Sequence, residues 1–283
     1  MQFAIERAAL YAGLMKSTLT VDTNNVASNA DRGSAASRAI ALGLAQRLKY
    51  TVTAQRGAGQ TAGNDFEALC ASFVRNTFLQ LAHLRPGMWT VEQYHGQRRA
   101  GLAMYEQYAH LEALDKAARD NPELAAALGS DYTIKPDVVV WRSPEPDSTI
   151  NAVQPLVDAS VATRSPLRLS VNQRPILHAS LSCKWTLRSD RAQNARSEAL
   201  NLIRNRKGRL PHIAVITAEP LPSRLASIAL GTGDVDCVYH FALYELQDTV
   251  ASLNLPDAQD MLAVMVDGGR LKDISDLPLD LSV

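Results

Sequence analysis

The sequence lacks the features that mark a secreted or membrane protein. It has only three cysteines, Cys70, Cys183 and Cys237, and their wide spacing and odd number argue against disulfides and a structural zinc site. No apolar run approaches the length that spans a bilayer. The N-terminal stretch MQFAIERAALYAGLMK carries Glu6 and Arg7 inside its apolar pattern, and no signal-peptide cleavage pattern follows. These absences predict a cytoplasmic protein.

The chain also lacks a net charge, since its formal charge at pH 7 is zero. Taken alone, this value argues against a nucleic-acid partner, but the distribution of charge reverses that conclusion. Eight basic and two acidic residues lie between Lys184 and Arg209, a net of +6, whereas eight acidic and two basic residues lie from Glu245 to the C-terminus, a net of −6. Because phosphate binding depends on the local patch, the basic segment favours DNA or RNA as a partner.

Internal repeats and a phosphate-binding loop are missing as well. Residues 55–64, QRGAGQTAGN, predict a glycine-rich loop, but they lack the Gly-Lys-Ser/Thr of a P-loop. Without a P-loop or a strand that carries paired carboxylates, a nucleotidyl transferase is disfavoured.

What is present predicts an α/β fold. Apolar periodicity indicates a central mixed β-sheet flanked by helices, in one domain over residues 1–283 with an N-terminal helical elaboration. We expect strands at 136–141, 177–185, 212–217 and 235–240, and helices at 2–15, 36–48, 65–84, 98–118, from 122, 189–206 and 241–253. The helices before residue 136 are expected to form a layer on one side of the sheet, and residues 143–170 a loop-rich insertion.

The stretch from strand 177–185 to helix 189–206 organises the chemistry. Strand alternation places Lys184 on a polar face with Ser182, and one face of the helix carries Arg191, Asn194 and Glu198. The following strand 212–217 completes a right-handed βαβ crossover. A lysine, a carboxylate and several arginines in one neighbourhood suit an enzyme that acts on a phosphodiester.

Phosphodiester hydrolysis needs hard oxygen ligands for a divalent metal and a cation near the attacked phosphate. Asp137, at the start of one strand, and Lys184, at the end of another, follow the order of the PD-(D/E)xK nucleases. Ser182 stands where that pattern has an acid, so Glu198 and the backbone carbonyl of Cys183 are the candidate replacements. Each residue also has a structural interpretation. Asp137 could belong to a Pro-Asp turn, Lys184 could be a solvated strand residue, and Glu198 could pair with Arg191, Arg204 or Arg206.

A second cluster, Arg188-Ser-Asp190-Arg191, follows the lysine by four to seven residues. An arginine fork matches the O6 and N7 acceptors of guanine, and an aspartate accepts from the N4 amine of cytosine. The cluster therefore suits the reading of adjacent G·C pairs. Its alternative interpretation is a salt-bridged helix N-terminus, in which the helix dipole stabilises Asp190.

These motifs together resemble the NgoMIV family of type II restriction endonucleases, within the group that cuts around a central CCGG. The resemblance rests on Ser182-Cys-Lys184, Arg188-Ser-Asp-Arg191, Glu198, and the downstream NRKGRLPH and PSRLASIALGTGDVDCVYHFALYEL. It extends from SNAD at Ser28–Asp31 through GQTAGNDFEA around Glu67 to KDISDLPLDL at the C-terminus. Only residues 143–170 and the first twenty depart freely from it.

The resemblance implies a restriction-endonuclease-like core and a role for each matching position. The catalytic residues would be Asp137, Lys184, Ser182, Glu198 and Glu67, and Mg²⁺ would be held by Asp137, Cys183, Glu198 and Glu67. The central CCGG would be read by Arg188, Asp190 and Arg191, and the outer G·C pair by Gln60, Asp31 and Arg224.

The family also implies a substrate and partners. The substrate would be double-stranded DNA, cut in palindromic GCCGGC after the first G to leave 5′ CCGG overhangs. The protein would be a homotetramer of two back-to-back dimers, paired in the cell with a methyltransferase that protects host DNA. Two rivals remain open: another PD-(D/E)xK nuclease, such as a repair or structure-specific enzyme, and a non-enzymatic DNA-binding module.

Overall fold

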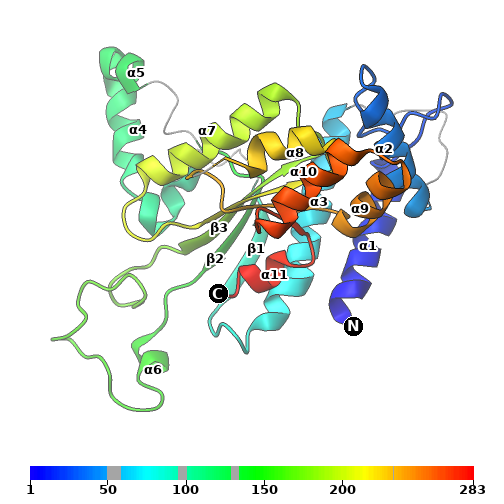
Figure 1. Cartoon of the computed structure of the whole chain (residues 1–283). Helices are drawn as coiled ribbons and strands as arrows, with labels where there is room; N and C mark the ends of the chain where they lie inside the picture. The colour runs from blue at the N-terminus through cyan, green and yellow to red at the C-terminus, as the bar shows by residue number, and fades with distance from the viewer. Residues whose placement is uncertain (50–58, 95–100, 129–133, 232) are drawn as a thin grey trace.

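A six-stranded sheet forms the centre of the computed structural model, which describes residues 1–49, 59–94, 101–128, 134–231 and 233–283 (Figure 1). The strands follow chain order across the sheet: β1 (Trp89–Gln93), β2 (Val138–Arg142), β3 (Ile176–Lys184), β4 (His212–Thr217), β5 (Cys237–His240) and β6 (Leu271–Asp273). The β1–β2 and β2–β3 pairs are antiparallel, and β3 to β6 are parallel. The predicted mixed sheet is confirmed.

Helices cover both faces of this sheet. Consecutive residues are buried in β2 and β4, at 138–140 and 213–217, which requires a cover on each side. The helices are α1 (Gln2–Ser17), α2 (Ala35–Arg47), α3 (Gly59–Phe78), α4 (Leu111–Asp120), α5 (Pro122–Leu128), α6 (Asp147–Ile150), α7 (Ser189–Asn205), α8 (Pro222–Ala229), α9 (Leu243–Ser252), α10 (Pro256–Asp267) and α11 (Leu277–Asp280). α3 contacts β1, β2 and β3, while α8 contacts β5 and α10 contacts β6. Figure 1 shows α7, α8 and α10 on one side of the sheet and α3 on the other.

The predicted βαβ unit is present as β3, α7 and β4. β3 and β4 pair in parallel, and their last residues, Lys184 and Thr217, stand opposite each other. Residues that face the sheet from α7, among them Ala195, Ala199 and Leu202, are almost fully buried. The carboxyl ends of the two strands therefore meet at one edge, where ligands bind in open α/β sheets.

The predicted helix at 98–118 is wrong. Residues 95–100 lie outside the described part of the chain, residues 101–104 and 106–108 form two short 3-10 helices, and α4 begins only at Leu111. Gly101 has a φ of +50°, which a right-handed helix does not allow. The side chain of Gln107 bonds the main chain of Leu177, accepting from its N–H at 3.0 Å and donating to its carbonyl at 2.7 Å. This segment is bent because it hydrogen bonds to β3.

Three other expectations for the N-terminal half need correction. The glycine-rich loop predicted at 55–64 is helical from Gly59, since the buried Ala62 continues the apolar stripe of Phe66 one turn earlier; residues 55–58 lie outside the described chain. α3 also ends at Phe78 instead of continuing to residue 84. The helices do not all form one layer, because α4 and α5 project away from the sheet in Figure 1 and α4 has only two buried residues.

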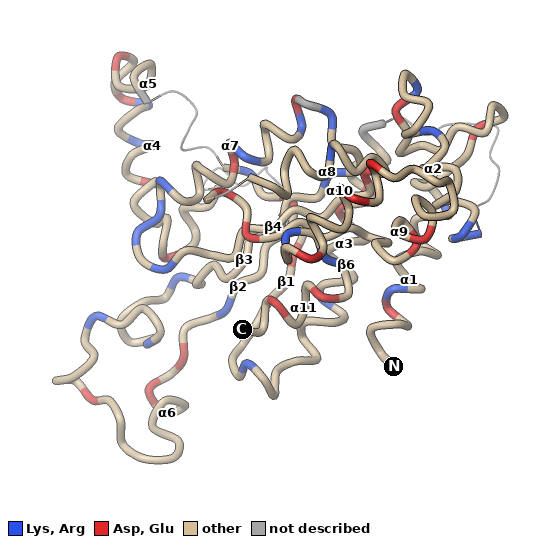
Figure 2. Tube along the Cα trace, viewed as in Figure 1, with Lys and Arg blue, Asp and Glu red and all other residues tan. Residues whose placement is uncertain are grey.

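Part of the acidic C-terminal charge is neutralised inside the protein. Arg7 of α1 pairs with Glu245 at 2.6 Å and with the buried Asp273 at 2.7 Å, and Lys272 pairs with Asp280 at 2.7 Å. Figure 2 shows acidic and basic segments interspersed along the trace instead of gathered at opposite ends. The C-terminal segment therefore exposes less negative charge than its net of −6 indicates, because Arg7 pairs with two of its acids.

The insertion at 143–170 contains the short helix α6 and is otherwise without helix or strand. Arg168 holds it together by donating to both carboxylate oxygens of Asp147, at 2.9 and 2.6 Å, and to the carbonyl of Val161 at 2.6 Å. Across the described residues, no helix has the length and apolar character needed to cross a membrane.

Candidate active site and DNA-reading surface

Asp137 and Lys184 lie side by side, as the sequence predicted. Asp137 directly precedes β2, and Lys184 is the last residue of β3, so antiparallel pairing of the two strands brings them together. Oδ2 of Asp137 accepts hydrogen bonds from Lys184 Nζ at 2.8 Å, from the Cys183 N–H at 2.7 Å and from Ser182 Oγ at 3.5 Å. The Asp137 and Glu198 charges hold the pKa of Lys184 above its usual value despite the opposing effect of burial, so this lysine stays a cation at neutral pH.

Two further carboxylates flank this pair. Glu67 lies on α3, where its buried neighbour Phe66 packs edge-on against Trp185 with ring centroids 5.3 Å apart, and Glu198 lies on α7. Burial raises the pKa of both groups, and the Asp137 carboxylate raises both further, while Lys184 lowers them. Each carboxylate is therefore close enough to Asp137 and Lys184 for their charges to shift its pKa.

Glu198 lies at this site and not in an exposed helical ion pair. It is half-buried, and in the described chain it forms no ion pair with Arg191, Arg204 or Arg206. Arg191 donates instead to Thr186 Oγ1 at 2.9 Å, and Arg206 to the carbonyl of Ile203 at 2.5 Å. The structure therefore does not show the alternative interpretation of Glu198, an ion pair with one of these arginines.

Glu67, Cys183, Lys184 and Glu198 line one pocket of about 240 Å³. Gly63, Asn64, Trp185, Arg191 and Asn194 complete its wall. Within the described residues, however, no three His, Cys, Asp or Glu side chains are arranged to hold a metal ion. Three of the four expected ligands, Glu67, Cys183 and Glu198, thus line this pocket, and the fourth, Asp137, is hydrogen bonded to Lys184 of its wall.

The donor set nevertheless fits a divalent metal. Mg²⁺ prefers carboxylate and carbonyl oxygens, and the site holds three carboxylates and the backbone of β3. The raised pKa values of Glu67 and Glu198 show that burial and mutual repulsion disfavour their charges. A bound cation would offset both penalties, so the chemistry of the side chains suits a divalent metal.

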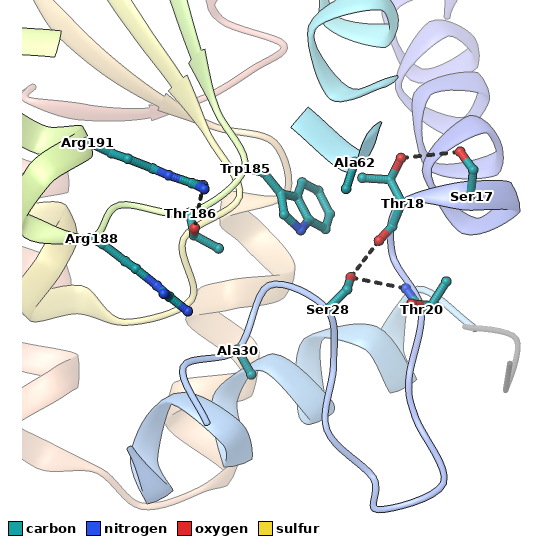
Figure 3. A pocket seen from close by; sticks show the side chains of 10 residues that line it. All are labelled: Ser17, Thr18, Thr20, Ser28, Ala30, Ala62, Trp185, Thr186, Arg188 and Arg191. Atoms are coloured by element: carbon teal, nitrogen blue, oxygen red, sulfur yellow. Dashed lines mark hydrogen bonds between the residues drawn. The ribbon is translucent and has the colours of Figure 1, made fainter. Parts of the chain in front are cut away.

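The three residues expected to read the central base pairs lie next to this pocket. Arg188 precedes α7, and Asp190 and Arg191 lie in its first turn; Arg188 and Asp190 are exposed. Arg188 and Arg191 also border a second pocket of about 200 Å³, and Arg191 lines both. Figure 3 shows the two arginines extended toward this second pocket, opposite the loop that carries Thr20 and Ser28. Arg191 therefore lies between the pocket of Lys184 and the pocket that Arg188 lines.

Two of the three residues expected at the outer base pair form an ion pair. Arg224, on α8, contacts the Asp31 carboxylate through Nη2. The Gly33 N–H and Arg224 hold the pKa of Asp31 below its usual value, and the charge of Arg188 lowers it slightly further. Arg188, Arg224 and Asp31 thus come together from three segments. Gln60 lies in the first turn of α3, and the structure does not describe its side chain.

Sequence reasoning missed two residues of this region. Gln93, at the end of β1, donates to Glu67 Oε2 at 3.4 Å, and no local pattern pointed to it. Glu219 is fully buried and accepts from the Leu187 N–H at 2.8 Å. Its signal was its position two residues after the buried strand β4, at the edge where the parallel strands end.

The topology and the helical cover on both faces are those of restriction-endonuclease-like α/β proteins. Comparison with known sequences leads to the same class. The family model described as NgoMIV restriction enzyme matches residues 12–283. The chain is also 57% identical over 282 residues to the type II restriction enzyme NgoMIV of Neisseria gonorrhoeae, with 99% of each chain covered. It therefore belongs to the NgoMIV restriction enzyme family and is a type II site-specific deoxyribonuclease.

Proposed function

We propose that the protein cleaves both strands of palindromic GCCGGC in a Mg²⁺-dependent reaction, after the first G, and leaves 5′ CCGG overhangs. The observation that carries the proposal is the Asp137–Lys184 pair, whose atoms lie 2.8 Å apart beside a pocket that Glu67 and Glu198 line. Arg191, in the first turn of α7, lines the same pocket. This arrangement puts the groups that hydrolyse a phosphodiester next to groups that recognise guanine.

The side chains divide the chemistry between them. Asp137, Glu67, Glu198 and the Cys183 carbonyl would hold Mg²⁺, which polarises the phosphate and lowers the pKa of the attacking water when it is bound. Lys184 keeps its proton and presents a positive charge to the phosphate. Ser182 and the Cys183 N–H fix the Asp137 carboxylate by hydrogen bonds. No covalent enzyme intermediate is needed, because water attacks the phosphorus directly.

Recognition is proposed to use two groups of side chains. Arg188, Asp190 and Arg191 read the central CCGG, since arginine pairs with guanine in two bonds and aspartate accepts from cytosine. The outer G·C pair is read by Gln60, Asp31 and Arg224. The ion pair of Asp31 with Arg224 supports this second group, because it holds both side chains together at one place.

The assembly and context of the enzyme are also proposals. The chain acts as one domain over residues 1–283 with an N-terminal helical elaboration, supported by a buried core cluster that includes residues from Leu10 to Leu281. It works in the cytoplasm as a homotetramer of two back-to-back dimers. A methyltransferase of the same specificity protects the host DNA from it.

Digestion of a plasmid of known sequence tests the proposed reaction. The purified protein is incubated with the plasmid in Mg²⁺ or in EDTA, and the fragment ends are sequenced. Ends that begin 5′-CCGGC at every GCCGGC site, in Mg²⁺ only, are the expected result. Ends set by DNA shape would favour a structure-specific nuclease, and a band shift on GCCGGC without any cleavage would favour a binding module.

Arg191→Ala is expected to weaken specific binding by about 1–3 kcal/mol and to relax selection at one G·C pair. Arg191 donates to Thr186 at 2.9 Å, so its guanidinium is held beside the pocket before DNA arrives. Competition binding between GCCGGC and a duplex with one base pair changed measures the effect. Arg119→Ala, in an exposed ion pair on α4, is the matched control. An unchanged binding ratio for Arg191→Ala would contradict its reading role.

A further inference from the structure

Glu219 is a fully buried carboxylate at the point where β4 ends. Its Oε2 accepts the Leu187 N–H at 2.8 Å, and its Oε1 accepts the Leu221 N–H at 3.2 Å. Burial raises the pKa of Glu219 to about 6, although both N–H donors and Arg224 oppose that shift. A buried acid is costly to keep charged, so its retention in the fold calls for specific partners.

Those partners belong to both groups of proposed reading residues. Leu187 directly precedes Arg188, so its bond to Glu219 fixes the backbone from which the central reading group starts. Arg224 Nη1 lies 3.8 Å from Glu219 Oε2, and the same guanidinium contacts Asp31. One carboxylate oxygen therefore faces the central group on one side and the outer group on the other.

The same turn is also joined to the strand that carries the catalytic lysine. Thr217 Oγ1 donates to the Lys184 carbonyl at 2.7 Å and accepts from the Glu219 N–H at 3.1 Å. A displacement of Glu219 is thus transmitted to the end of β3 as well as to the start of α7.

We propose that Glu219 is a positioning residue that fixes the outer reading group relative to the central one. In this assignment Glu219 contacts no base. It fixes the backbone just before Arg188 and the position of the Arg224 guanidinium. The inference rests on the proposed function, because it assumes that these arginines read DNA. It predicts that the two kinds of contact Glu219 makes can be lost separately.

Two substitutions separate them. Glu219→Gln keeps one oxygen, which can accept the Leu187 N–H, but removes the charge that holds Arg224 and the oxygen that accepts the Leu221 N–H at the start of α8. Glu219→Ala removes all three contacts. Affinities are measured in EDTA for GCCGGC, for a duplex with the outer pair changed, and for one with a central pair changed. Thermal unfolding of each variant shows that it is folded.

We expect Glu219→Gln to lower discrimination at the outer pair roughly tenfold and to leave central discrimination within about twofold of wild type. Glu219→Ala should lower both roughly tenfold. Asp273→Asn is the matched control, since Asp273 is also fully buried and binds an arginine and the Leu243 N–H at 3.0 Å. It should reduce stability without changing either ratio.

Unchanged discrimination at the outer and central pairs in Glu219→Gln would overturn the inference and leave Glu219 a structural residue. If the alanine variant does not fold, the result for Glu219→Gln decides alone. An Asp273→Asn variant that changed the ratios as much would also overturn it, because stability would then explain the effect. A wild-type protein without preference for GCCGGC would overturn the proposed function itself, which makes the two failures distinguishable.

Discussion

Lys184→Ala is expected to abolish DNA cleavage, a loss of at least about 10²–10³-fold, and to leave binding to GCCGGC largely intact. The Lys184 side chain is 17% exposed and its ammonium lies 2.8 Å from Asp137, so it is a cation held in a partly buried site at the pocket. Its removal takes away charge stabilisation where the phosphate would become more negative. The proposed reading contacts are made by other side chains, so specific binding is expected not to depend on Lys184.

Single-turnover cleavage of a duplex with one GCCGGC site measures the first effect, and a band shift in EDTA measures the second. Asp137→Ala should behave in the same way, because it removes the carboxylate that orients Lys184. Lys272→Ala is the matched control: Lys272 is also a strand lysine in an ion pair, at 2.7 Å from Asp280. Loss of specific binding together with cleavage in Lys184→Ala would refute the division between cutting and reading residues.

Removal of divalent metal is expected to abolish cleavage, and Mg²⁺ to restore it. The argument is electrostatic: burial and the Asp137 charge raise the pKa of Glu67 and Glu198, so three carboxylates share a site where they repel one another. A cation bound among them would relieve that repulsion and bring the charge the reaction needs.

The Mg²⁺ dependence of the cleavage rate gives this prediction a graded measurement. Glu198→Gln should raise the Mg²⁺ concentration for half-maximal cleavage by about tenfold or more, because one anionic donor is lost. Glu112→Gln, in an exposed ion pair with Arg174, should leave that concentration unchanged. Full cleavage in EDTA, or equal Mg²⁺ curves for Glu198→Gln and wild type, would rule out the proposed metal site.

Periodicity predicted the centre of the sheet well and its edges poorly. β2, β3 and β4 were found because they are buried runs bounded by clear turn residues. β1 and β6 were missed, since each is short and paired on one side only within the described sheet, which leaves little apolar pattern. The segment around Gln107 has helical periodicity, but its hydrogen bonds to β3 prevail over local propensity.

In the candidate site, too, local patterns predict some residues, and only the folded chain defines the others. Asp137, Lys184 and the first turn of α7 could be found from the sequence because they sit on predictable strands and a predictable helix. The pairing of Asp31 with Arg224 could not, since 193 residues separate them. Glu219 belongs to no motif: apart from the nearby Leu221 N–H, its backbone partner is the N–H of Leu187, 32 residues away, and that contact is defined only once the chain has folded.

The ion pairs of Arg7 bear on how the enzyme is made. Arg7 bonds Glu245 and Asp273, which follow it by 238 and 266 positions. During synthesis the ribosome releases the N-terminal helix first, so these bonds cannot all close until Asp273 has been added. The loop that lines the pocket of Arg188 follows that helix directly. A growing chain therefore holds the helix that precedes this loop without its two ion pairs until β6 has been made.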